Sequence, residues 1–194
     1  VVRCFEDENI VHVSGNVDPI RDMEVVNTEL ILADIEYMER SLIKVQKIVK
    51  SGDKKDVVEK EMLTRIKDSL NKGIPVRSLD FSDVEREFLK EYFFLTIKPV
   101  LYVTNLSDKI TKNIDEFKKK VKEEKSEMVE IFSKLEIELC ALSEEESKEF
   151  CKEYGIEETG LKKMIRAAYS MLGLITFFTV KEPEVKAWSI KSGM

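Results

Sequence analysis

The stretch TIKPVLYVTNLSD, residues 96–108, decides the fold, because an uncharged apolar run passes directly into four residues that end in a carboxylate. Residues 100–103 are β-branched, aliphatic and aromatic, a pattern typical of a strand that is covered on both faces in a parallel α/β sheet. Pro99 cannot donate to a strand ladder, so it can only open the strand. The stretch therefore predicts a buried strand with a polar loop at its carboxyl end.

That polar loop is a candidate binding site. In doubly wound sheets, ligands bind just beyond the carboxyl ends of the strands, where Asn105, Leu106, Ser107 and Asp108 follow. An amide offers a donor and an acceptor while a carboxylate only accepts, and together they can grip a flat heterocycle. The pattern favours nucleobase recognition. The alternative is a simple turn held by Asx-type hydrogen bonds.

Several segments along the whole chain resemble one protein family. They are residues 1–6 (VVRCFE), 10–15 (IVHVSG), 26–30 (VNTEL), 32–36 (LADIE), 95–108, 174–179 (LITFFT) and 184–190 (EVKAWSI). With them the chain resembles the YchF/Obg-like ATPases, a family of the Obg-related P-loop NTPases. Its Asn-x-x-Asp is similar to the Asn-Lys-x-Asp base signature of P-loop GTPases, with Leu106 at the lysine position.

The resemblance implies an α/β fold made of a partial P-loop NTPase (Rossmann-like) core, an inserted antiparallel helical coiled-coil hairpin and the first β-hairpin of a β-grasp TGS domain. We expect residues 1–20 and 92–172 to form the second half of the nucleotide-binding domain. Residues 21–91 would form the insertion and 173–194 the start of the TGS domain, where residues 175–180 and 185–190 alternate as paired strands do.

The phosphate-binding part of such a site is expected to precede Val1. None of the seven glycines lies in a Gly-x-x-x-x-Gly-Lys-Ser/Thr pattern, so no loop of these 194 residues can cradle phosphates in that way. The resemblance places that loop and the ligands of Mg²⁺ upstream. We therefore expect no catalytic residue in this chain and no nucleotide turnover by the chain alone.

A second site segment follows residues 128–132, which are predicted to form another strand. The resemblance implies that the loop after this strand supports the base through backbone amides, with Ser133 and Lys134 as candidates. The alternative is that Ser133 is a plain cap for a helix over residues 135–142. Other helices are expected over residues 82–93, opened by a Ser82–Glu85 capping box, and within 109–125, 143–155 and 161–172.

The predicted insertion begins with a long helix over residues 23–50 and returns through a second over 54–71. The first carries apolar residues at alternating spacings of four and three, typical of a coiled-coil seam: Ile31, Ile35, Met38, Leu42, Val45 and Val49. The second is expected to cover it with Val58, Met62, Ile66 and Leu70. Lysines near the tip indicate either a solvated end or a contact with RNA or an acidic partner.

Composition narrows the classes of function. The chain is 43% hydrophobic and 36% charged with a net charge of −6, which is typical of a soluble globular protein and argues against indiscriminate binding of polyanions. Three cysteines without Cys-x-x-Cys spacing predict a reduced, cytoplasmic compartment and no zinc site. No apolar run approaches the ~20 residues of a membrane span. We expect no membrane contact and a monomer.

The resemblance implies that the intact protein is an Mg²⁺-dependent ATPase and a ribosome-associated translation or stress factor, with the ribosome or ribosomal RNA as partner. The alternatives are an Obg-type GTPase and a non-enzymatic helical scaffold that docks on the ribosome or a protein. For the base, Asp108 stands where the family usually has glutamate and is the GTPase form, whereas Leu106 offers a hydrophobic surface near the ring. On balance ATP is predicted over GTP.

Overall fold

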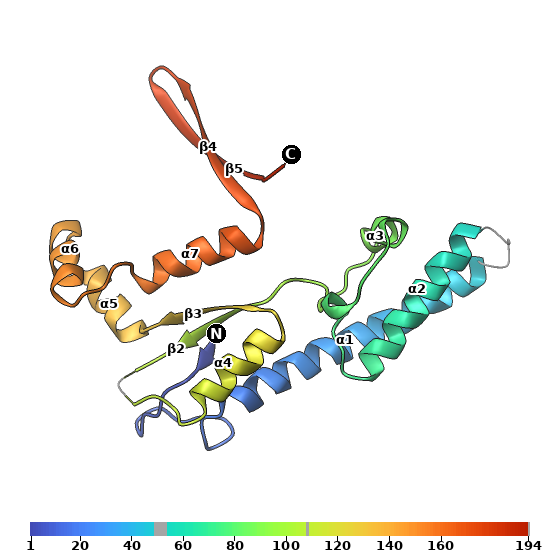
Figure 1. Cartoon of the computed structure of the whole chain (residues 1–194), viewed down its shortest axis with the longest axis horizontal. Coiled ribbons are helices and arrows are strands. Elements are labelled where there is room, and N and C mark those ends of the chain that lie inside the picture. Colours follow the sequence, from blue (N-terminus) through green and yellow to red (C-terminus); the bar gives the residue numbers. More distant parts are fainter. Residues whose placement is uncertain (49–53, 108, 194) are drawn as a thin grey trace. The chain divides into compact units, whose positions relative to one another are not determined.

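The chain folds into two compact units, which are described separately. In the computed structural model, residues 1–48, 54–107 and 109–193 are described. Residues 1–20 and 100–194 form the first unit, and residues 21–99 form the second. The second unit is a single insertion into the first along the sequence (Figure 1). The later boundary falls after Pro99, whereas residue 91 was predicted.

A three-stranded parallel sheet organises the first unit. The strands β1 (Val2–Arg3), β2 (Leu101–Asn105) and β3 (Glu127–Ile131) lie in the order β1–β2–β3. In register, Asn105 lies between Arg3 and Ile131, so the three carboxyl ends share one edge. The parallel sheet with its helices confirms the predicted mixed α/β class. β1 has only two residues, and Phe5 beyond it forms an antiparallel bridge with Ile110.

The same bridge delays the helix predicted within residues 109–125. The Glu6 amide donates to the Lys109 carbonyl at 2.9 Å, and the Thr111 amide donates to the Cys4 carbonyl at 3.1 Å. These bonds hold residues 109–111 extended, so α4 starts later and covers Ile114–Glu123. Its buried Phe117 and Val121 form an apolar side, and α4 contacts β3.

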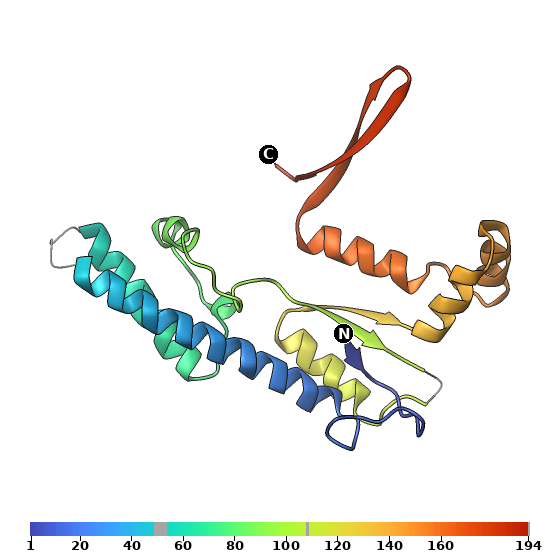
Figure 2. The same ribbon diagram turned by 180° about the vertical axis from the view of Figure 1, so that it is seen from behind.

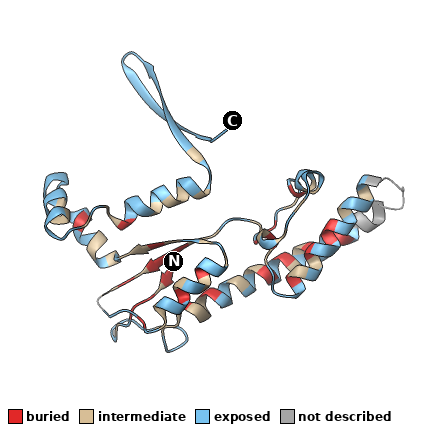
Figure 3. Cartoon of the chain, viewed as in Figure 1, coloured by how far each residue is buried: buried red, intermediate tan, exposed pale blue. Residues whose placement is uncertain are grey.

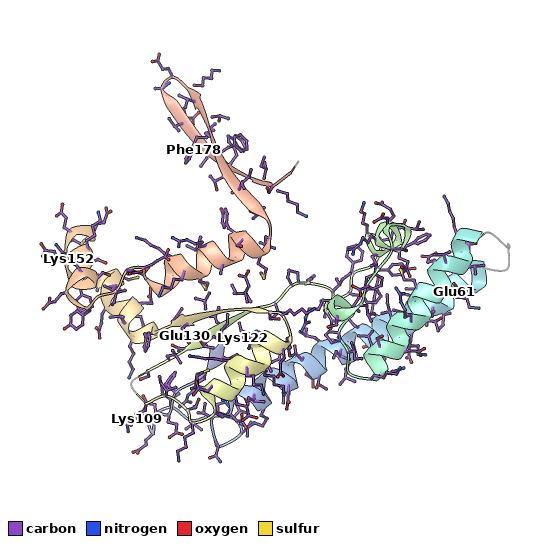
Figure 4. The ribbon with its side chains drawn as sticks, viewed as in Figure 1. Glu61, Lys109, Lys122, Glu130, Lys152 and Phe178 are labelled. Atoms are coloured by element: carbon purple, nitrogen blue, oxygen red, sulfur yellow. The ribbon has the colours of Figure 1, made fainter. Side chains whose placement is uncertain are left out.

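Three helices and a hairpin complete this unit: α5 (Ser133–Ala141), α6 (Glu144–Glu153), α7 (Gly160–Met171), β4 (Leu174–Lys181) and β5 (Glu184–Lys191). The predicted hairpin is present, with Phe177 opposite Trp188. Both strands are almost wholly exposed (Figure 3), and Phe178 projects from the ribbon at 67% exposure (Figure 4). No helix within the described ranges is long and apolar enough to cross a membrane.

The second unit is a helical hairpin with a continuous apolar core. It contains all but the first two residues of α1 (Pro19–Ile48), together with α2 (Lys54–Asn71), the short 3-10 helix η2 (Val76–Ser78) and α3 (Asp83–Leu89). α1 and α2 lie side by side in both views (Figures 1 and 2). The predicted seam is confirmed for Ile31, Ile35, Met38, Leu42, Met62, Ile66 and Leu70, which all belong to the core or pack against it.

Two details of that seam differ from the prediction. Val58 is wrong as a seam residue, since it is 36% exposed, and Leu63 is fully buried instead. The buried side of α2 is therefore wider than predicted, with Leu63 beside Met62. The side chains of Val45 and Val49 lie outside the described part of the chain, so the seam is followed only as far as Leu42.

Asp34 of α1 fixes the return segment of this unit. Its carboxylate oxygens accept the Leu95 amide at 2.7 Å, the Thr96 amide at 2.8 Å and the Thr96 hydroxyl at 2.6 Å. The Thr96 hydroxyl in turn accepts the Val76 amide at 3.0 Å. Asp34 is only 1% exposed, so this buried carboxylate has its hydrogen-bond partners within the unit.

The Ser82–Glu85 capping box is confirmed, with both reciprocal hydrogen bonds in place. The helix that it opens, α3, ends at Leu89 rather than at the predicted Phe93. The amides that follow α3 donate to carbonyls three residues earlier, as those of Glu91 and Tyr92 do, so the chain turns instead of continuing as an α-helix. The Phe93 amide then donates to the Tyr37 hydroxyl of α1 at 3.3 Å, which is a tertiary bond.

Candidate functional site

The two predicted site segments meet at one edge of the sheet. β2 ends at Asn105 and β3 at Ile131, and these two residues are paired in register. The Leu106 amide donates to the Ile131 carbonyl at 2.8 Å, which carries the pairing one residue beyond the strands. Since ligands of α/β sheets bind at the carboxyl ends of the strands, residues 105–107 and 132–134 lie at the position where a ligand is expected.

The side chain of Asn105 joins these segments directly. Its Oδ1 accepts the Ser133 hydroxyl at 2.8 Å and the Ser133 backbone amide at 3.2 Å. The N-cap residue of α5 is Phe132, whose side chain cannot cap, so Asn105 satisfies one of the amides that a helix start leaves unpaired. The predicted role of Ser133 as a plain helix cap is therefore wrong: Ser133 is the first helical residue and donates both bonds.

This geometry leaves one half of the Asn105 amide available. Both bonds use Oδ1, and the Nδ2 amino group has no acceptor among the residues that the structure describes. An asparagine amino group donates two hydrogen bonds. The bonds to α5 thus orient the side chain of Asn105, while the two N–H donors of its Nδ2 group take no part in them. In contrast, the Ser133 amide is already occupied and does not serve a ligand in this arrangement.

The remaining residues of the polar loop differ in exposure. The Leu106 side chain is 6% exposed, so it supports the loop from inside instead of offering the hydrophobic surface predicted for it. Ser107 is half-buried, and Asp108 lies outside the described residues. Among the described residues of the loop, the groups that can serve a ligand are Asn105, Ser107 and the backbone.

Lys134 contacts the loop that follows β1. Its Nζ lies 3.7 Å from Oδ2 of Asp7 while most of the lysine side chain is exposed. The hydrogen bond from the Asn9 amide, together with the charge of Lys134, holds the pKa of Asp7 below its usual value. The sequence prediction did not include Asp7, because nothing in its local pattern indicates a partner 127 positions away.

Arg3 orders the same loop and was also missed. Its guanidinium donates to the carbonyls of Phe5 at 3.1 Å, Ile10 at 3.0 Å and Asp7 at 3.4 Å. It also lies 4.8 Å from the centroid of the Phe5 ring, within cation–π range. One side chain thereby holds residues 5–10 in the conformation that brings Asp7 to Lys134.

The described residues hold no group of three His, Cys, Asp or Glu side chains that could bind a metal ion. The cysteines Cys4, Cys140 and Cys151 form no disulfide within the described part of the chain. The chain's described residues therefore do not fit a dedicated Mg²⁺ site.

Comparisons with known proteins agree with this geometry. The chain is 42% identical over its whole length to the "Ribosome-binding ATPase YchF" of Bacillus subtilis and 41% identical to that of Escherichia coli O157:H7. The solved structure of the Schizosaccharomyces pombe YchF GTPase covers the whole chain at 32% identity with a TM-score of 0.87. No protein-family model matches the chain. The chain spans about half of the length of these relatives, 54–55%.

A parallel sheet with polar loops at its carboxyl edge and a helical unit inserted before β2 makes the chain an α/β protein whose ligand position is expected at that edge. Within that class the sequence matches are to proteins named YchF, at 34–42% identity over the whole chain, and the structural match is also to a YchF protein. The chain is therefore similar to YchF proteins over its whole length, which confirms the resemblance found in its motifs.

Proposed function

We propose that the protein to which these residues belong binds and hydrolyses ATP as a YchF-type P-loop NTPase, and that this chain reads the base. The observation that carries the proposal is the Asn105 side chain, held by Ser133 through Oδ1 with its amino group left for a ligand. The names of the relatives, an ATPase in bacteria and a GTPase in fission yeast, support nucleotide hydrolysis in general.

The chemistry of Asn105 suits a purine but does not choose between purines. Adenine and guanine both present N7 as an acceptor, so an Asn105 amino group that donates there binds either base. Discrimination falls to the remainder of the loop. A carboxylate such as Asp108 can accept from the N1–H and 2-amino group of guanine, and adenine has neither donor.

We retain ATP as the preferred nucleotide by a modest factor. Asp108 follows the anchored Asn105 by three positions in the sequence. One misaligned hydrogen bond between its carboxylate and the base is worth about 1 kcal/mol, which is enough to reverse the preference between ATP and GTP. The buried side chain of Leu106 anchors the start of the loop. The family's glutamate is longer by one methylene, so Asp108→Glu tests this length directly.

Hydrolysis depends on groups that this chain does not supply. Phosphoryl transfer is promoted by positioning and by charge stabilisation at the phosphates, where Mg²⁺ neutralises charge when it is bound. We propose that the phosphate loop and the Mg²⁺ ligands come from other residues of the longer protein, which in the relatives is almost twice the length of this chain. Residues 1–194 contribute base affinity and orientation.

We further propose that the ribosome is the partner, that the protein acts as a monomer and that residues 173–194 begin a TGS domain. The bacterial relatives carry ribosome binding in their names. The exposed hairpin β4–β5 buries none of its described residues, as expected of a two-strand ribbon that belongs to a larger sheet. Co-sedimentation of the full-length protein with ribosomes tests the partner, and removal of residues 30–90 separates docking by the helical unit from nucleotide binding.

The nucleotide proposal is tested by competition binding of ATP and GTP to the full-length protein. ATP bound more tightly, with little change in Asp108→Glu, supports it. GTP bound about tenfold more tightly than ATP, a difference of about 1.4 kcal/mol that disappears in Asp108→Glu, would identify an Obg-type GTPase instead. If neither nucleotide showed saturable binding, the non-enzymatic scaffold would be the remaining function for the protein.

A further inference from the structure

A long excursion separates the base-loop helix α5 from α7. The chain leaves α5 at Ala141, forms α6 and returns to the sheet at Gly160, the first residue of α7. No residue of α6 is buried. An excursion with so little packing is held mainly at its two ends. The contact between those ends therefore determines how firmly α5 is positioned.

Glu136 makes that contact. It lies one turn into α5, and its Oε1 accepts the Gly160 amide at 2.6 Å while its Oε2 accepts the Leu161 amide at 3.3 Å. These two amides are among those that the start of α7 leaves without helical partners. A carboxylate at this end of a helix is also favoured by the helix dipole. Thr159 caps the same start through its side chain and the Lys162 amide, at 3.4 Å.

Gly160 makes room for this contact. A Cβ atom at this position would lie 2.8 Å from Cγ2 of Ile131 and 2.9 Å from Oε1 of Glu136, closer than real Cβ contacts. Ile131 is the last residue of β3 and the register partner of Asn105. The absence of a side chain at Gly160 thus lets α7 start directly against the edge of the sheet where the site lies.

These contacts form one connected path. Asn105 binds Ser133 at the start of α5, Glu136 follows one turn later, and its carboxylate grips α7, which itself packs on β3 and β2. We infer that Glu136 and Gly160 are positioning residues for the base-binding loop: together they hold Ser133 in place to orient the Asn105 amide. The inference rests on the proposed function of this edge as a nucleotide site.

A purely structural role would have different consequences. If Glu136 only stabilised the fold, its loss would weaken all ligands of the protein alike. If it positions the base loop, its loss weakens ligands that carry a base and spares those that bind through phosphates alone. Inorganic tripolyphosphate is a probe without a base, and its affinity compared with that of ATP separates the two roles.

The experiment measures ATP and tripolyphosphate affinity of the full-length protein and of three variants. Glu136→Gln keeps the side-chain shape but places an amino group or a neutral oxygen at the Gly160 and Leu161 amides. Gly160→Ala introduces the Cβ clash. Glu138→Gln, on the exposed side of α5, is the matched control. Circular dichroism establishes that each variant is folded.

We expect Glu136→Gln and Gly160→Ala to bind ATP about tenfold more weakly, about 1.4 kcal/mol, with tripolyphosphate affinity unchanged and Glu138→Gln equal to the wild type. Equal losses of ATP and tripolyphosphate, or no loss of ATP affinity, would overturn the inference. If the wild-type protein bound ATP no more tightly than tripolyphosphate, the proposed base site itself would be overturned.

Hydrogen exchange provides a readout that needs no ligand and applies even if Gly160→Ala is unstable. Glu136→Gln is expected to speed exchange of the Ser133 amide as well as of the Gly160 and Leu161 amides, because loosening α5 weakens its bond to Asn105. Faster exchange confined to Gly160 and Leu161, with Ser133 unchanged, would show that the contact does not reach the base loop and would contradict the inference.

Discussion

Two polar side chains, one in each unit, bind backbone amides in opposite ways. Asp34 in the helical unit is 1% exposed and directs its carboxylate at three donors of the return segment. Asn105 at the sheet edge is half-buried and uses only Oδ1, on Ser133. The Asp34 arrangement is closed, because its carboxylate binds donors of its own unit. The Asn105 arrangement is open, because its amino group remains available to a ligand.

The difference separates a structural polar group from a binding one. A buried carboxylate whose partners are all internal contributes to the stability of its unit, and its loss leaves donors without acceptors. An amide that is anchored on one atom and available on the other contributes orientation to a ligand. The comparison therefore predicts that damage in the helical unit affects unfolding, whereas damage at the sheet edge affects binding.

The largest effect is expected from a charge inside the helical core. Leu42→Asp places a carboxylate at a position that is 8% exposed, which we expect to cost roughly 4 kcal/mol or more and to unfold the helical unit. Ile43→Asp, one residue further and 55% exposed, is the matched control. Helicity and thermal midpoint are measured. Equal behaviour of the two variants would show that the seam is misplaced.

The second-largest effect is expected from removal of the Asp34 carboxylate. Asp34→Ala leaves the amides of Leu95 and Thr96 without their acceptor, and we expect the free energy of unfolding to fall by about 3 kcal/mol. Glu36→Ala on the exposed side of α1 serves as the control. Urea unfolding measures both. If Asp34→Ala were as stable as Glu36→Ala, the closed network would have no role in stability.

At the open site the order reverses, with binding affected more than stability. Asn105→Ala is expected to reduce ATP affinity of the full-length protein about tenfold. It is expected to lower the free energy of unfolding by only about 1 kcal/mol, the usual value of a lost helix cap. Asn113→Ala, which loses the bond to Asp18 elsewhere in the same unit, is the control. A loss of stability without a loss of affinity would make Asn105 structural.

The smallest predicted effect depends on pH. Burial alone raises the pKa of Glu85, but hydrogen bonds from Ser82 and the charge of Arg65 outweigh it, so its pKa is lowered on folding. A lowered pKa stabilises the folded state above the usual value for glutamate and stops doing so as the pH falls through the folded value.

Glu85→Gln should therefore reduce the free energy of unfolding by about 1 kcal/mol at pH 7. The gap to the wild type should narrow by pH 3, as urea titrations at both pH values would measure. A gap that is the same at pH 3 and pH 7 would show that the charge of Glu85 makes no contribution.

The fold could be predicted where the pattern is local. The run at residues 100–103, the seam residues of α1 and the alternation around Trp188 each act over a few positions, and the structure contains the expected strand, helix and hairpin. Element ends were missed where distant bonds decide them. α4 begins only at Ile114 because residues 109–111 pair with residues 4–6, and α3 ends before Phe93, whose amide donates to the Tyr37 hydroxyl of α1.

The same division between local patterns and distant contacts applies to the residues of the site. Asn105 could be proposed from the sequence because it stands where a strand gives way to a polar loop, and Ser133 because the family resemblance implies a base-supporting loop after the next strand. In the structure both the amide and the hydroxyl of Ser133 donate to Asn105, a role that neither the predicted base support nor the alternative plain cap had included. Arg3, Asp7 and Glu136 lie near the site only through loop conformation and helix packing, which no sequence period encodes.

Hydrogen exchange of the full-length protein with and without ATP tests the central claim most directly, since it reports on both units at once. We expect ATP to slow exchange at residues 105–107 and 132–134 at the sheet edge and to leave residues 54–71 of α2 unchanged. Saturation with ATP without any slowing at 105–107 and 132–134 would contradict the assignment of this edge as the base site.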